Sequence, residues 1–114
     1  MSSQRTEEGG DEEMAELRDE YPSGWRVLTQ HDSVGYIIDA LLDAPDYQFS
    51  KSKLAEKAGV SRQSVHTHIP LLLRLDIVEV VEGSSPEKYS LNSGDEMVRE
   101  LHRLNGLVNE KLDA

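Results

Sequence analysis

Hydrophobic and polar residues alternate with the period of an α-helix in several stretches of the chain, and 32–43 is the first clear one. Its apolar residues recur three and four positions apart, so they share one face. Asp32 or Ser33 can cap its start, and Pro45 follows its end. We therefore predict an amphipathic helix over 32–43.

Two further helices, at about 51–57 and 62–75, are predicted on either side of Gly59. Ser50 and Ser61 are suitable N-caps for them, and Gly59 can take the positive φ that commonly follows a helix end. The second of these helices is expected to bury a stripe that contains Val65, Ile69 and Leu72.

The stretches 77–81 and 88–91 are rich in β-branched or alternating residues and enclose the turn cluster 83–86, which predicts a β-hairpin. A short extended piece is expected at 47–49. A final helix over about 94–112 is predicted, with Asn92 or Ser93 as its cap.

These elements predict an α+β fold that is mainly α with a small β-hairpin. Residues 1–20 carry eight acids and two bases, so we expect a largely disordered acidic tail there. Residues 21–92 are expected to form the folded domain. Residues 93–114 are expected to form a C-terminal amphipathic helix.

Composition excludes several functions. The chain has 114 residues, a net charge of −10 and no cysteine, so it cannot form a disulfide or a thiolate metal site. It has no apolar run that would span a membrane and no apolar signal segment, which predicts a cytoplasmic protein. His66 and His68 are two positions apart and point to different helix faces, so no metal site is expected. The acidic composition also suits a high-salt cytoplasm, as in a halophile.

No catalytic motif is present: we find no nucleophile with a base, no phosphate loop and no metal-ligand spacing. We therefore expect neither an enzyme nor a cofactor. A small-molecule effector cannot be inferred from the sequence.

Residues 54–69 read Leu-Ala-Glu-Lys-Ala-Gly-Val-Ser-Arg-Gln-Ser-Val-His-Thr-His-Ile and combine two helices with a short glycine-containing turn, as in a DNA-binding helix-turn-helix. With 75–79 leading into the hairpin, about half of the chain, 32–92, resembles the winged helix-turn-helix transcriptional regulators of bacteria and archaea. The resemblance implies a winged helix-turn-helix with an added C-terminal helix, and a nucleoid-associated regulator whose partner is double-stranded DNA.

In that family the helix 62–75 lies in the major groove. The residues opposite its buried stripe suit base recognition: arginine reads guanine, glutamine reads adenine, and the threonine methyl contacts thymine. The expected base-contacting residues are Arg62, Gln63, His66 and Thr67.

Hydroxyls and bases around this face are expected to contact phosphates. These residues are Ser50, Lys51, Lys53, Ser61, Ser64, Arg74 and Lys88. The hairpin departs from the family pattern, because Glu82 and Glu87 flank its tip and Lys88 is its single base. Contact between the wing and DNA is therefore left open.

The apolar stripe of the C-terminal helix requires a partner surface. We expect a homodimer, which would present two recognition helices about 34 Å apart, with packing on the same chain as the alternative. Trp25 is expected to be an anchor in the core or in the dimer seam. The predicted dimer residues are Trp25, Met97, Leu101, Leu104 and Val108.

A second interpretation belongs to another functional class. Winged helices can also bind proteins, and a net charge of −10 would suit a basic protein partner. This alternative is a protein-protein interaction module without sequence-specific DNA binding.

Overall fold

The structure is a computed structural model that describes residues 18–114. The chain divides into two compact units, one up to Asp32 and one from Ser33 to Ala114. The predicted acidic tail lies outside the described residues except for its last three.

The described part of the first unit contains helix α2 (Gly24–Thr29), which the sequence pattern did not predict. Ser23 caps it, because its hydroxyl accepts a hydrogen bond from the Arg26 N–H at 3.2 Å. The expectation of a core position for Trp25 is wrong, since 62% of this residue is exposed. In this short helix the Trp25 side chain is exposed, and Val27 and Leu28 are only partly buried.

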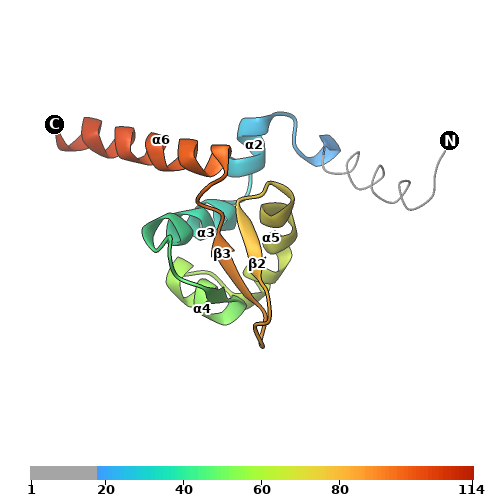
Figure 1. Cartoon of the computed structure of the whole chain (residues 1–114). Coiled ribbons are helices and arrows are strands. Elements are labelled where there is room, and N and C mark those ends of the chain that lie inside the picture. The colour runs from blue at the N-terminus through green and yellow to red at the C-terminus, as the bar shows by residue number, and fades with distance from the viewer. Residues whose placement is uncertain (1–17) are drawn as a thin grey trace. The chain divides into compact units, whose positions relative to one another are not determined.

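The remaining elements belong to the second unit, except for the first residue of α3, and their order is shown in Figure 1. In chain order they are α3 (Asp32–Asp43), β1 (Phe49–Ser50), α4 (Lys51–Ala58), α5 (Arg62–Arg74), β2 (Val78–Val81), β3 (Lys88–Leu91) and α6 (Glu96–Asp113). The chain is mainly helical with one small antiparallel sheet, which confirms the predicted α+β class.

The sheet has three strands in the order β1-β3-β2, all antiparallel. The predicted hairpin is β2–β3, in which Val78 lies opposite Leu91. Of the predicted extended piece, Phe49 is in a strand, and with Ser50 it pairs with β3. Since α4 follows β1 directly, this pairing fixes the start of α4 against the hairpin.

The turn between α4 and α5 has the predicted chemistry. The Ser50 hydroxyl accepts from the Lys53 N–H at 3.2 Å, and the Ser61 hydroxyl accepts from the Ser64 N–H at 3.0 Å. Gly59 ends α4 at a φ of 75°, and its N–H donates to the Ala55 carbonyl at 2.9 Å. Glycine adopts this left-handed conformation without steric cost.

Aliphatic side chains from every helix of the second unit and from the sheet form the core. The largest fully buried side chains are Ile37, Leu41, Leu54, Leu72, Ile77, Val34, Val65 and Val98. Burial of a side chain of this kind contributes about 1.5–3 kcal/mol. The buried faces of α4 and α5 therefore fix the positions of these helices, from which their polar side chains project.

Helix α6 begins two residues later than predicted, and its cap is Asp95. The Asp95 carboxylate accepts from the N–H groups of Met97 and Val98 at 2.9 and 3.3 Å. Asn92 is held at the end of the hairpin instead, because its backbone N–H donates to the Ile77 carbonyl and its side-chain amide donates to the Asp76 carbonyl. Because the hairpin holds Asn92, the helix begins later in the chain, at Glu96.

No helix within residues 18–114 combines the length and the apolar character that crossing a membrane requires.

Candidate nucleic-acid interface

Helix α5 separates its apolar and polar side chains onto opposite faces. Val65, Ile69 and Leu72 are at most 3% exposed and anchor the helix in the core. All four residues predicted to contact bases are exposed, and they are Arg62, Gln63, His66 and Thr67. The first two turns of α5 therefore offer a continuous polar surface.

Two of these side chains are positioned by hydrogen bonds. The Arg62 Nε donates to the Ser52 hydroxyl at 3.1 Å, which links the start of α5 to the first turn of α4. This bond leaves the two terminal nitrogens of the guanidinium available for a bidentate contact. The Gln63 amide donates to the Thr67 hydroxyl at 3.4 Å, one helical turn away.

Lys51 and His66 form a second link between α4 and α5. The Lys51 Nζ donates to the His66 Nδ1 at 2.9 Å. An ammonium group has no acceptor, so Nδ1 must be the unprotonated nitrogen and Nε2 must carry the hydrogen. With this tautomer, the Nε2 N–H of His66 is a donor beside the Lys51 ammonium group.

The predicted phosphate-contacting serines have structural tasks. Ser50 and Ser61 use their hydroxyl oxygens as helix caps, and the Ser61 hydroxyl also donates to the Ser64 hydroxyl at 3.1 Å. The hydroxyl hydrogens of Ser50 and Ser64 are the ones left to donate to an anion.

Three of the predicted phosphate-contacting bases differ in what surrounds them. Lys53 Nζ lies 3.6 Å from the Glu56 carboxylate. Arg74 lies at the other end of α5 from Arg62, about 18 Å along the helix, so the structure does not bring it together with the first turn. Lys88 pairs with Ser50 in the sheet and thus lies beside the start of α4.

Lys57, which belongs to the same basic segment, is neutralised by Asp43 at 2.5 Å. The hydrogen bond from Lys57, helped by its charge, holds the pKa of the Asp43 carboxyl below its ordinary value. In contrast, neither Lys51 nor Arg62 makes an ion pair with any residue of 18–114. Two cationic side chains without a carboxylate partner among residues 18–114 therefore lie where α4 and α5 begin.

A depression of about 170 Å³ extends from this region to the hairpin. It is lined by Ser50, Lys51, Ser52, Arg62, Pro86 and Glu87. The Glu87 carboxylate accepts from the Tyr89 hydroxyl at 2.5 Å, and burial followed by this carboxylate raises the pKa of Tyr89 to about 12. Ser52 was missed in the sequence, because an exposed serine ten positions before Arg62 has no pattern that marks it.

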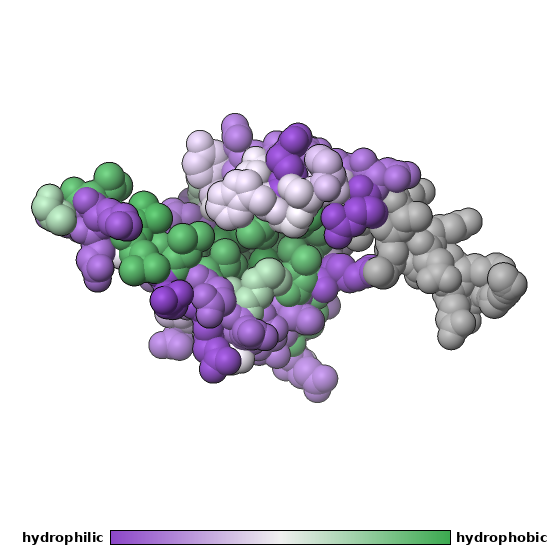
Figure 2. All heavy atoms as spheres, turned by 90° about the horizontal axis from the view of Figure 1, so that it is seen from above, coloured by the Kyte–Doolittle hydropathy of each residue, from purple (hydrophilic) through white to green (hydrophobic). Residues whose placement is uncertain are grey.

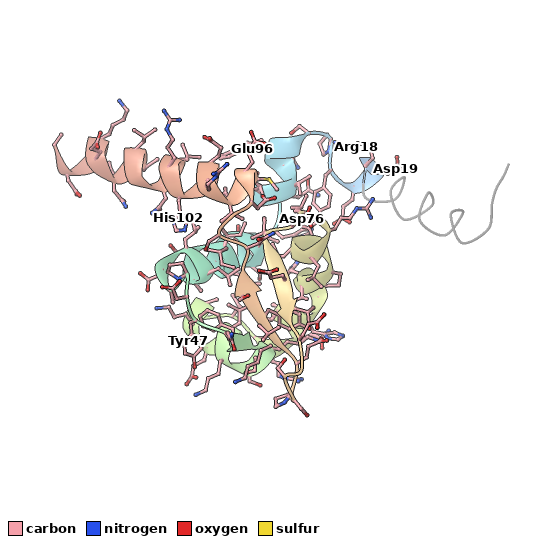
Figure 3. All side chains as sticks on the ribbon, in the orientation of Figure 1. Arg18, Asp19, Tyr47, Asp76, Glu96 and His102 are labelled. Atoms are coloured by element: carbon pink, nitrogen blue, oxygen red, sulfur yellow. The ribbon has the colours of Figure 1, made fainter. Side chains whose placement is uncertain are left out.

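A larger depression of about 360 Å³ lies beside α4, where Tyr47 and Phe49 pack with ring centroids 4.6 Å apart. Figure 3 shows Tyr47 in the segment between α3 and α4. Within residues 18–114 no group of three His, Cys, Asp or Glu side chains is placed to hold a metal ion.

The predicted dimer residues are distributed over both units. Trp25 belongs to the first unit, and the four others lie on α6, where Leu104 and Val108 are exposed and Met97 and Leu101 are partly exposed. The buried contact of α6 is Val98, which the predicted stripe omitted although it lies three positions before Leu101.

No protein-family model matches the chain, and no curated protein matches it.

Proposed function

We propose that the chain is a DNA-binding transcriptional regulator of the winged helix-turn-helix kind, with α5 as the recognition helix. The single observation that carries this proposal is the polar face at the start of α5. It presents Arg62, Gln63, His66 and Thr67 together, opposite a fully buried stripe. These side chains offer the donors and acceptors that distinguish base pairs in the major groove.

The charge distribution supports the same proposal. Lys51 and Arg62 lack carboxylate partners within the described chain, although the whole chain carries −10. The N-terminal turn of α4 adds backbone N–H groups beside Lys51. Phosphates on one strand would therefore meet α4 while α5 enters the groove.

The experiment begins with duplexes selected from a random pool by the full chain, whose affinities are then measured by fluorescence anisotropy. Changing Arg62 to Ala and Gln63 to Ala together is expected to weaken binding to the selected duplex by at least tenfold, because each bidentate base contact contributes about 1–3 kcal/mol. The control is Arg99→Ala, which removes an equal charge from the exposed surface of α6. Undiminished affinity of the double variant, or no enriched duplex, contradicts the proposal.

A second candidate is a protein-interaction module for a basic partner, and the hairpin favours it. Glu79, Glu82 and Glu87 are exposed there, while Lys88 is its only base. Under this interpretation Glu82→Gln with Glu87→Gln weakens binding to a basic peptide, and the double change at Arg62 and Gln63 does not. DNA binding predicts the reverse dependence.

A further inference from the structure

One face of α6 is apolar and uncovered. Its exposed apolar residues are Leu104, Leu107, Val108 and Leu112, at 45%, 39%, 48% and 78%, and every residue from Arg103 onward is exposed. Figure 2 shows hydrophobic side chains running along this helix from the body of the second unit. A continuous apolar stripe on a helix requires a surface that covers it.

The uncovered half of α6 also needs a partner to remain helical. A helix of about twelve residues without tertiary contacts is marginal in water. This part of α6 contains Asn105, Gly106 and Asn109, which are weak helix formers. Packing of the apolar stripe against another surface would therefore stabilise this half of α6 as a helix.

Two opposite charges border the stripe and indicate what covers it. With 3.6 residues per turn, Glu100 and Lys111 lie on the same side of Leu104 and Val108, with Leu107 beyond them, and about 16 Å apart along the axis. Both are exposed, and Glu100 has only a long contact, 3.7 Å, with Arg103 on its outer side. In an antiparallel pair of identical helices, the same edge of each helix faces its counterpart. Glu100 of each copy would then lie beside Lys111 of the other copy. In a parallel pair they would stay apart.

We propose that α6 pairs antiparallel with α6 of a second copy of this chain. Leu104 packs against the partner subunit's Val108, and Glu100 lies beside the partner subunit's Lys111. The contact is symmetric, so each pair occurs twice around a two-fold axis. This inference goes beyond DNA recognition and does not depend on it.

The charge distribution favours this helix as the contact. Residues 96–114 contain four acids and three bases, a net charge of −1, whereas residues 1–95 contain 18 acids and nine bases, a net charge of −9. Two α6 helices can therefore meet with little net repulsion between them.

The seam is short. A helix pair of this length buries on the order of 1,000 Å², which is near the lower limit for a specific interface. We therefore expect association in the micromolar range.

The first test is sedimentation equilibrium of the full chain from about 1 to 100 μM. The wild type is expected to form a dimer, and Leu104→Glu with Val108→Glu is expected to remain monomeric. Thermal unfolding of the same variant, followed by circular dichroism, checks that the second unit still folds. A wild type that is monomeric throughout this range overturns the proposal.

The second test decides the orientation by charge reversal. Glu100→Lys and Lys111→Glu should each weaken self-association about tenfold, because each turns two attractive contacts into repulsive ones. An equimolar mixture of the two variants should form a heterodimer as tightly as the wild type. Matched controls on the outer face are Glu110→Lys and Arg99→Glu, which should leave the dimer intact.

Failure of the mixture to recover association, or equal weakening by the outer-face controls, overturns the antiparallel pairing. The Arg62 and Gln63 double variant is expected to lose duplex binding but to self-associate like the wild type. The two proposals can therefore be tested independently of each other.

Discussion

For single residues, the partner of each basic side chain determines how much charge it offers to an anion. Lys57 faces Asp43 and Lys53 faces Glu56, whereas Lys51 contacts a neutral imidazole nitrogen and Arg62 contacts a hydroxyl. The sequence predicted one basic cluster over this segment. It could not show that Asp43, fourteen positions before Lys57, removes one member, because that contact depends on how α3 packs beside α4.

The ion pair of Asp43 gives a pH-dependent prediction. The pKa of Asp43 is lowered in the folded chain, so its contribution to stability is present above the unfolded pKa of about 3.9 and is lost as the pH falls through the lower folded value. Asp43→Asn should therefore be slightly less stable than the wild type at pH 7 and equal to it at strongly acidic pH. Urea unfolding at both pH values measures this difference. Asp39→Asn, also exposed on α3, is the control, and a deficit that persists in acid contradicts the assignment.

Tyr89 predicts a change at alkaline pH. The folded pKa is raised to about 12, while the unfolded tyrosine titrates near 10, so between these values the folded state holds more protons. Stability should consequently fall as the pH rises from 10 to 12. Tyr89→Phe keeps the buried ring and should lose this tyrosine-dependent part of the slope. Spectrophotometric titration of the wild type against the variant checks the pKa directly, and ionisation of Tyr89 near pH 10 would contradict the prediction.

Among the secondary-structure elements, a helix end with a single suitable capping residue could be predicted from the sequence. A helix start with several suitable caps could not. The bounds of α3 and the roles of Ser50, Gly59 and Ser61 follow from local chemistry. The start of α6 does not, because Asn92, Ser93 and Asp95 are all acceptable caps and the sheet decides among them. Helix α2 was missed for a related reason, since a Pro-Ser-Gly sequence is typical of a turn.

The left-handed conformation at Gly59 gives a prediction for the α4–α5 turn. A Cβ at this position would meet no atom within 4 Å, so Gly59→Ala should cost only the backbone penalty, about 1–2 kcal/mol. Gly35, inside α3, is a matched control with equally open surroundings. Gly35→Ala should stabilise the chain by about 0.5–1 kcal/mol, because alanine favours the helix. Urea unfolding measures both, and effects of the same sign would show that the reasoning is wrong.

For the molecule as a whole, two salt responses of opposite sign are expected. Duplex binding should weaken as potassium chloride rises, because contacts to phosphates release counterions. Self-association should strengthen, because the Debye length falls from about 10 Å at 0.1 M to 3 Å at 1 M, and the repulsion that is screened between two chains of charge −10 outweighs the attraction that is screened in the exposed Glu100–Lys111 pairs. Anisotropy and sedimentation equilibrium at both concentrations measure the two responses. A dimer that dissociates at 1 M salt contradicts the second one.

Ser50 ends β1, caps α4 and pairs with Lys88 of the hairpin, so one residue joins a strand, a helix and a neighbouring strand. A tilt of the hairpin must consequently be transmitted to the first turn of α4, and from there to α5 through Arg62 and Ser52. The surface that these elements share is thus ordered when the chain folds, before any ligand arrives. Little backbone conformational entropy remains to be lost on association, so adaptation of the backbone falls mainly to the partner.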